Sequence, residues 1–506
     1  MREDVIGHGD VLTSQKLQEQ TQEFLTRFDQ NPRAAMAEKP AKFDDSGHPI
    51  DAPTGFSTPD IASGNYVLER DSLRKRFRTL VNGVLISLEN ILPGRAPIEN
   101  NDRPENLVDT LRYAKLADIE SANLRAAALA ETPWSDDYWA LYTGCVAKRY
   151  ADPGFPMSEN WQTNFDYVRQ HSLDAVLRSG DATAIDQLSP AEKYDLLVGS
   201  TTGALTQAMW NEGKWYQDRS GKVETWMGIC HGWAPAAYML PRPRKAVTVL
   251  AADGKTQLRF YPADIKALAS LLWANAHTVA RFVGGRSNDK NPATDSIGRP
   301  TSPAVFDNNP GTWHLSVVNQ IGVAKRSFVM DATYDYEVWN QPIYAYRYTY
   351  FNPQSMRAVN TLQEATVARA QFTKDRFRRY RSPQAALVTG ISMYVQYIAE
   401  TEPSHDTTNA PSEDRVVTVR YMYDLEQNAQ GGILGGEWYT GTRHPDFLWT
   451  PPPGARALTP ADSVATGTWP QGQPVPQAWR AAALRVADRS LPLAKIVEEL
   501  VRLANA

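Results

Sequence analysis

The sequence has few cysteines, no long apolar run and no excess of positive charge. Only two of its 506 residues are cysteines, which excludes a fold built on a disulfide framework. No stretch of about 18 apolar residues occurs, so we expect no membrane span. The first residues also lack the apolar core of a signal peptide. A formal net charge of −4 gives no reason to expect a nucleic-acid partner.

The composition is that of a folded globular protein, with 42% hydrophobic and 22% charged residues. We predict that residues 1–60 form an N-terminal arm or pro-segment, in which an amphipathic helix over 14–30 precedes a stretch rich in proline, glycine and aspartate. Residues 61–506 are predicted to form the catalytic region. Its first part, 61–200, is predicted to be mainly helical, and 201–506 to carry a catalytic helix and an antiparallel sheet.

Hydrophobic periodicity locates the predicted elements. Helices are expected over residues 73–92, 106–130, 262–283 and 491–503, and a capping box, Ser189 to Glu192, predicts the start of another. Strands are expected over 312–319, 327–331 and 415–425, with a hairpin over 247–261 that turns at Asp253–Gly254. The basic cluster over 374–381 is interpreted as a solvated helix face rather than a binding patch. Helices early and strands late indicate an α+β fold.

One cysteine, Cys230, lies in a distinctive segment. Gly228 and Gly232 flank it, and Pro235 follows. A helix tolerates proline only in its first turn, so this pattern predicts that Cys230 lies at or just before a helix N-terminus. The partial positive charge there favours the thiolate, which is the nucleophilic form. A packed structural cysteine is the alternative, but the flanking glycines and the proline favour a positioned nucleophile.

A thiol nucleophile needs a base, and the base needs an orienting group. Among eight histidines, His314 lies in an apolar, β-branched run, and Asp331 ends the strand expected next. A hairpin would bring their side chains together as base and orienter. His231 adjoins the cysteine, so its side chain should diverge, and His277 is interpreted as an ordinary helix residue. His444 and Asp446 form an alternative pair, ranked lower because a proline separates them far downstream.

A cysteine on a helix, then histidine and aspartate on paired strands, is the order of papain-like enzymes. The sequence resembles the transglutaminase elicitor family, which is known from oomycete cell walls and from bacteria. The resemblance runs from about residue 134 to the C-terminus. The matching blocks are Gly228–Ala237, Gly298–Pro303, Trp313–Leu315, Asn319–Gly322, Asp331, Val338–Pro342, Gly435–Tyr439 and His444–Trp449.

The resemblance implies a papain-related fold and a calcium-dependent protein-glutamine γ-glutamyltransferase, secreted or on the cell surface, with no organic cofactor. Its partners would be glutamine-bearing proteins and primary amines, and its catalytic residues Cys230, His314 and Asp331. Val338–Pro342 matches the core of the elicitor peptide of oomycete members. Residues 343–347, Ile-Tyr-Ala-Tyr-Arg, depart from the Val-Arg-Gly-Phe-Lys that follows in the family, so we do not expect elicitor activity. A packed turn is the alternative interpretation of Trp339.

The implied chemistry needs an oxyanion site and a dry cleft. The Cys230 backbone N–H is the natural first oxyanion donor, and the Trp226 indole is a candidate for the second. Trp233 and Trp139 are candidates for the cleft wall, since excluding water protects a thioester from hydrolysis. Packing in the core is the competing interpretation of all three tryptophans.

Two alternative functions remain open, a papain-like cysteine protease or glutamine deamidase with the same three residues, and a binding or elicitor protein with a vestigial site. Cys145 is either a buried filler or a disulfide partner of Cys230. Oxygen ligands for calcium are available in loops, although none follows the EF-hand spacing. These candidates are Asn288, Asp289, Asp295, Asp307, Asn308, Asp335 and Glu337.

Overall fold

The computed structural model describes residues 14–43, 49–50, 79–81, 84–85, 101–276, 278–285, 292–301, 308–332, 338–440 and 444–506. Its α-helices are α1 (Ser14–Gln30), α2 (Pro32–Ala37), α4 (Leu116–Ser121), α5 (Trp161–Gln170), α6 (Leu173–Ser179), α7 (Ala182–Asp186), α8 (Pro190–Val198), α9 (Ala204–Ser220), α10 (Cys230–Met239), α11 (Pro262–Asn275), α12 (Pro310–Val317), α13 (Leu362–Ala365), α14 (Gln477–Leu484) and α15 (Ala494–Leu503). A π-helix, Val318–Val323, directly continues α12.

The strands are β1 (Lys42–Phe43), β2 (Pro49–Ile50), β3 (Thr79–Val81), β4 (Val84–Leu85), β5 (Ala126–Ala128), β6 (Val247–Leu250), β7 (Gln257–Phe260), β8 (Thr278–Val279), β9 (Arg281–Gly284), β10 (Val329–Asp331), β11 (Asn340–Asn352), β12 (Arg357–Val359), β13 (Thr366–Ala368), β14 (Leu387–Ala399), β15 (Arg415–Gln427), β16 (Ile433–Trp438) and β17 (Phe447–Thr450). None of the helices among the described residues is both long and apolar enough to cross a membrane.

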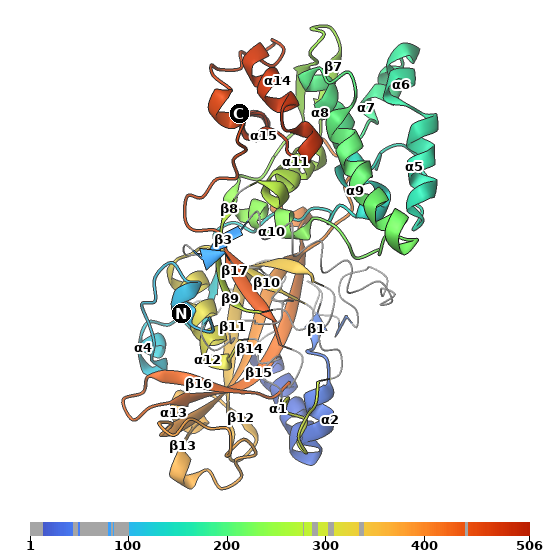
Figure 1. Ribbon diagram of the computed structural model, residues 1–506. Helices are drawn as coiled ribbons and strands as arrows, with labels where there is room; N and C mark the ends of the chain where they lie inside the picture. The colour runs from blue at the N-terminus through green and yellow to red at the C-terminus, as the bar shows by residue number, and fades with distance from the viewer. Residues whose placement is uncertain are drawn as a thin grey trace.

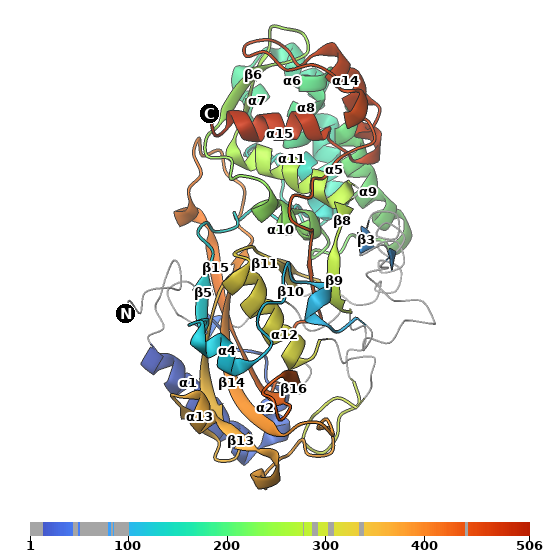
Figure 2. The same cartoon turned by 90° about the vertical axis from the view of Figure 1, so that its left-hand side faces the viewer.

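Helices and sheet occupy two lobes (Figure 1). The helical lobe gathers α5 to α11 with the hairpin β6–β7, and the chain returns to it at the end through α14 and α15. Figure 2 shows α15 lying across this lobe beside α11. The apolar face of α15 explains that position, because Ile496, Val497 and Leu500 are fully buried there. The helix α10, which begins at Cys230, lies where the helical lobe meets the sheet.

The sheet lobe is built on a large antiparallel sheet with the strand order β2-β1-β15-β14-β11-β10-β17-β9. Its three long central strands, β11, β14 and β15, have 13 residues each. Helix α12 packs on one face, where Trp313 meets Tyr421 at 5.1 Å between ring centroids. Helix α1 packs on the other face, where the Thr21 hydroxyl donates to Ser392 Oγ at 2.9 Å. Both figures show these helices on opposite sides of the sheet.

Several predicted elements are confirmed. The helix over 14–30 is α1, with Leu17, Phe24, Leu25 and Phe28 buried. The Ser189–Glu192 capping box is formed at the start of α8. The hairpin over 247–261 is β6–β7, and the strand over 415–425 lies within β15. The mixture of helices with an antiparallel sheet is confirmed as well. A papain-like core and the chain divisions at residues 60 and 200 remain predictions.

Other predicted elements are wrong. Within 106–130 only α4 is α-helical, and β5 lies near its end. The structure describes β3 and β4 inside the helix predicted over 73–92, whose remaining residues lie outside the described part. The basic segment 374–381 forms turns rather than a helix. The run over 312–319, predicted as a strand, lies in α12 and the π-helix. Because of this last difference, His314 lies on a helix rather than on a strand.

Candidate active site

Cys230 is the first residue of α10, as predicted. The chain reaches it through a close backbone contact, in which the Ile229 N–H donates to the Tyr138 carbonyl at 2.7 Å. Only glycine fits at position 228, two residues before Cys230, because a Cβ there would lie 2.3 Å from that same carbonyl oxygen. The prediction for Pro235 is wrong, since this proline lies inside the helix rather than in its first turn.

The second flanking glycine, Gly232, lets α10 approach α11. A Cβ there would lie 2.1 Å from the Ser270 carbonyl oxygen and 2.5 Å from the Ala274 Cβ. The two glycines therefore serve packing on either side of Cys230. Together they fix the N-terminus of α10 against both Tyr138 and α11, so the position of the sulfur is set by the backbone.

The Cys230 sulfur faces the start of β11. It lies 3.6 Å from the Val338 carbonyl oxygen, to which the thiol donates, and 3.5 Å from the Asn340 Nδ2, which donates to the sulfur. Cys230 is 6% exposed. The helix N-terminus favours negative charge on the sulfur, because it presents N–H dipoles to it. The Val338 carbonyl, by contrast, accepts a hydrogen bond from the protonated thiol.

The Asn340 side chain is oriented by Trp449 on β17. The Trp449 indole N–H donates to Asn340 Oδ1 at 2.9 Å. An indole N–H is only a donor, so the carboxamide must present its oxygen to Trp449 and its NH₂ group to Cys230. This pair of residues was not anticipated from the sequence, because three elements far apart in the chain bring it together.

Asp331, predicted as the orienting acid, lies directly across from Asn340 in the β10–β11 pair. Opposite residues of an antiparallel pair point to the same face, so Asp331 shares the face of the sheet that meets Cys230. Its Oδ1 accepts from the Trp339 backbone N–H at 3.0 Å. Asp331 therefore lies on the same face of the sheet as Asn340, whose carboxamide contacts Cys230.

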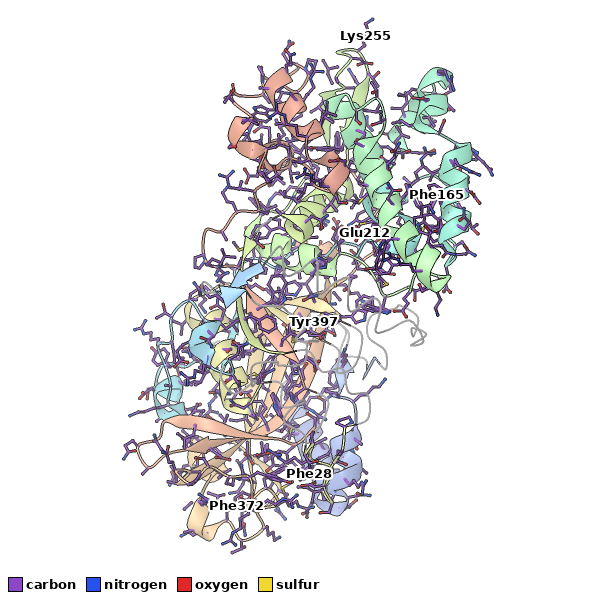
Figure 3. The ribbon with its side chains drawn as sticks, in the orientation of Figure 1. Phe28, Phe165, Glu212, Lys255, Phe372 and Tyr397 are labelled. Atoms are coloured by element: carbon purple, nitrogen blue, oxygen red, sulfur yellow. The ribbon has the colours of Figure 1, made fainter. Side chains whose placement is uncertain are left out.

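His314 does not join them, and its predicted role as the base of Cys230 is wrong. Its ring packs against Tyr348, at 5.0 Å between ring centroids, which lies eight residues after Asn340 along β11. At about 3.4 Å per residue, these two strand positions are about 27 Å apart. The register of the β11–β14 pair also places Tyr348 and Asn340 on different faces of the sheet. Ile343 and Tyr346 pair with Tyr397 and Val395 across a bulge, which puts Tyr348 on the face opposite Asn340. Figure 3 marks Tyr397, which pairs with Ile343 near the start of β11.

The surroundings of His314 suit a buried neutral imidazole. The residue is fully buried on α12, and its Nδ1 lies 2.9 Å from the Tyr423 hydroxyl. Its Nε2 makes no hydrogen bond to any described residue. Burial lowers the pKa of His314 to about 3, because the interior disfavours the charged form. This histidine serves packing on the α12 side of the sheet.

His314 should make the protein sensitive to acid. The ordinary pKa of 6.5 applies in the unfolded chain, and the folded value is about 3. The unfolded state therefore binds more protons below pH 6.5, and stability falls as the pH falls through that window. Between pH 7.5 and pH 5 the loss from this residue is about 2 kcal/mol. We expect His314→Gln to abolish this pH-dependent loss of stability. The free energy of unfolding in urea at both pH values measures it.

The exposed His171→Gln, which removes a histidine from the surface, is measured beside it as the comparison variant. A His314→Gln variant with the same loss of stability between pH 7.5 and pH 5 as wild type would show that the imidazole is not kept neutral.

Comparison with known proteins identifies the family. The transglutaminase elicitor model matches residues 110–466, which is more than half of the chain. The chain belongs to the transglutaminase elicitor family. Among solved structures, it is similar to the GP42 transglutaminase from Phytophthora sojae, with 21% identity and a TM-score of 0.46 over 74% of this chain and 94% of that chain. No curated protein matches the chain.

In this member of the transglutaminase elicitor family, the tryptophans proposed for the oxyanion and cleft donate to other groups. The Trp226 indole donates to Glu224 at 2.8 Å, so it is not directed at an oxyanion beside Cys230. The Trp233 indole donates to the Trp134 carbonyl at 2.9 Å, and the Trp139 indole to Asp136 at 2.9 Å. Trp233 and Trp139 are fully buried. These contacts favour the packing interpretation for all three.

The block that matches the elicitor peptide core is buried in this family member. Val338, Trp339, Asn340 and Gln341 are at most 7% exposed. Trp339 packs against Tyr138 at 5.3 Å between ring centroids, and Gln341 donates to Glu400 at 2.6 Å. The block is therefore packed beside Cys230 rather than exposed, and its last three residues begin β11 rather than form a turn.

The other histidines named from the sequence, and Cys145, are placed as follows. His231 follows Cys230 in α10, whereas His277 is not among the described residues. His444 stacks on Trp438 at 4.8 Å, beside Tyr423 on the sheet. Cys145 and Cys230 are both buried and do not form a disulfide, which favours the buried-filler alternative for Cys145.

The described residues contain no group of three or more His, Cys, Asp or Glu side chains that could hold a metal. Of the calcium candidates, Asp295 is described, and its carboxylate already accepts from Arg379 and Tyr380. Its donor set does not fit calcium. Asn308 is described too, with its backbone oxygen taken by the Trp438 indole at 2.9 Å. The other candidates lie outside the described residues.

Proposed function

We propose that this protein is a protein-glutamine γ-glutamyltransferase with Cys230 as its nucleophile. The observation that carries the proposal is the position of the Cys230 sulfur at the start of α10, 3.5 Å from an oriented amide donor. Membership of the transglutaminase elicitor family supports the same reaction. Asp331, across from Asn340, supplies the acidic side chain of the site.

The first half-reaction forms a thioester. The Cys230 thiolate attacks the carbonyl carbon of a glutamine side-chain carboxamide, and a C–S bond forms while the carbonyl electrons move to oxygen. When the tetrahedral intermediate collapses, the C–N bond breaks and ammonia leaves with the proton that the base took from the thiol. The acyl group stays on the sulfur.

The second half-reaction transfers the acyl group to an amine. The ε-amine of a lysine attacks the thioester carbon, gives up a proton to the base and forms an isopeptide bond as the C–S bond breaks. Because His314 is remote, we propose that another histidine is the base. His277, two residues after the end of α11 in the chain, is the candidate to test, and His231, whose side chain should diverge from Cys230, is the comparison.

An amine-incorporation assay tests the proposal. The purified full chain is incubated with a glutamine-rich protein and a fluorescent primary amine, with and without calcium, while ammonia release and peptide cleavage are followed in parallel. We expect stoichiometric ammonia release and amine incorporation, both blocked by prior alkylation with iodoacetamide. His231→Gln and His277→Gln are assayed beside wild type, and the base is the histidine whose loss abolishes turnover. The family resemblance predicts a need for calcium and a secreted protein.

Other outcomes assign other functions. Ammonia release without amine incorporation would make the protein a glutamine deamidase, with water as the acceptor. Cleavage of the polypeptide would make it a cysteine protease. Absence of all three activities, with and without calcium, would refute the proposal and leave a binding protein with a vestigial site.

A further inference from the structure

The Asn340 carboxamide is oriented beside Cys230 by Trp449, whose ring also packs in the apolar cluster that contains Val338 and Phe447. Trp449 fixes its oxygen at 2.9 Å, and the NH₂ group faces Cys230 at 3.5 Å. Asn340 is 3% exposed, so this donor is desolvated as well as oriented. A preorganised, desolvated N–H group is what stabilises charge that develops during a reaction.

The distance suits an oxyanion better than it suits the sulfur. A separation of 3.5 Å makes a weak hydrogen bond to the thiol at rest. In the tetrahedral intermediate the oxyanion is bonded to the carbon that the sulfur has attacked, so it lies within about 3 Å of Sγ. A donor directed at the sulfur from one side can therefore contact that oxygen with little movement.

The backbone supplies the other donor. Cys230 is the first residue of α10, and the first N–H groups of a helix have no acceptor within the helix. The Trp226 indole is committed to Glu224, so it does not compete with Asn340 for the role of second donor.

We propose that the Asn340 side chain is the second oxyanion donor, beside the Cys230 backbone N–H, and that Trp449 is the positioning residue that prevents its carboxamide from flipping. This inference rests on the proposed function. It assigns Asn340 a role in both half-reactions, because acylation by glutamine and deacylation by an amine each pass through a tetrahedral oxyanion on the same carbon.

The test separates oxyanion stabilisation from activation of the thiol. Asn340→Leu and Trp449→Phe are assayed for amine incorporation, for alkylation of Cys230 by iodoacetamide and for inhibition by a glutamine-like peptide aldehyde. The aldehyde adds to sulfur and forms a tetrahedral oxyanion, whereas alkylation displaces iodide and forms none. Gln396→Leu, which removes a buried amide from β14, is the matched control and should behave as wild type in all three measurements.

For Asn340→Leu we expect kcat to fall about 10²- to 10³-fold and aldehyde affinity to fall in step, with KM and the alkylation rate within about threefold of wild type. Trp449→Phe should give a smaller loss of the same kind, and it tests the idea even where Asn340→Leu fails to fold. An unchanged kcat in both variants would overturn the inference. So would an alkylation rate that falls as far as kcat, because the amide would then act on the thiol. If wild type lacks turnover, the proposed function fails, while aldehyde binding still reports on Asn340.

Discussion

Replacement of Cys230 by alanine is expected to lower amine incorporation by at least about 10³-fold, because the thioester forms on its sulfur and no other atom can carry the acyl group. The fold should survive. A thiol is a weak donor and a weak acceptor, so loss of its contacts with Val338 at 3.6 Å and Asn340 at 3.5 Å costs about 1 kcal/mol or less. Turnover and the melting temperature, measured on the same preparation, separate the two effects.

Cys145 provides the matched control. It is the only other cysteine of the chain, and it is also buried and outside any disulfide. Cys145→Ala removes a thiol from the core and should lower the melting temperature modestly, while kcat stays within about threefold of wild type. If Cys230→Ala retained more than about a tenth of wild-type turnover, Cys230 would not be the nucleophile.

The position of Cys230 could be predicted because the signal is local. Gly228 and Gly232 mark the two places where backbone from other segments comes close, and such contacts leave a glycine in the sequence. The predicted location was correct even though Pro235 was misplaced within the helix. The helix α1 and the capping box of α8 were predictable for the same reason, since each depends on residues within one or two turns.

The residues just before His314 carry a helix-start signal that is stronger than the apolar run around it. Its segment is rich in valine and was interpreted as a strand. Asn309 and Pro310 immediately precede it, and in the structure the Asn309 side chain caps α12 by accepting from Thr312, with Pro310 in the first turn. A capped, proline-led start indicates a helix, and the apolar run is buried because α12 packs on the sheet.

The partners of Cys230 within the sheet could not be derived by pattern alone. Asn340 meets Trp449 because β11 and β17 both pair with β10, and no local pattern encodes that strand order. Asp331 was predicted because it ends the strand expected after His314. In the structure it lies across from Asn340, not beside His314. Register between strands that are distant in the chain is set by the whole core.

The prediction for the basic segment 374–381 is wrong for a related reason. It was interpreted as a solvated helix face, yet Arg381 is fully buried and meets three carboxylates. Its guanidinium lies 2.5 Å from Asp424, 3.0 Å from Asp375 and 3.4 Å from Glu426. Two of these acids come from β15, more than forty positions away in the chain. A run of charged residues predicts an exposed surface only where no oppositely charged residue from a distant part of the chain packs against it.

Loss of Arg381 is accordingly expected to be among the most destabilising single changes in the chain. Arg381→Met keeps the length of the side chain but leaves Asp424 and its neighbours as uncompensated buried charges, which costs about 3–5 kcal/mol. The free energy of unfolding in urea at pH 7.5 measures this loss. The difference from wild type should shrink as the pH is lowered, because the carboxylates left without a partner can then be protonated.

Arg376, in the same segment, is the control because its ion pair is partly exposed. It donates to Asp29 near the end of α1 at 2.8 Å, with the two side chains 27% and 52% exposed. Such pairs contribute about 1 kcal/mol at most, so Arg376→Met should cost far less than Arg381→Met. Equal losses from the two variants would contradict the role assigned to Arg381. A large gap would show that this buried cluster, which also accepts the Tyr439 hydroxyl at 3.1 Å, fixes the segment between β13 and β14 to the sheet.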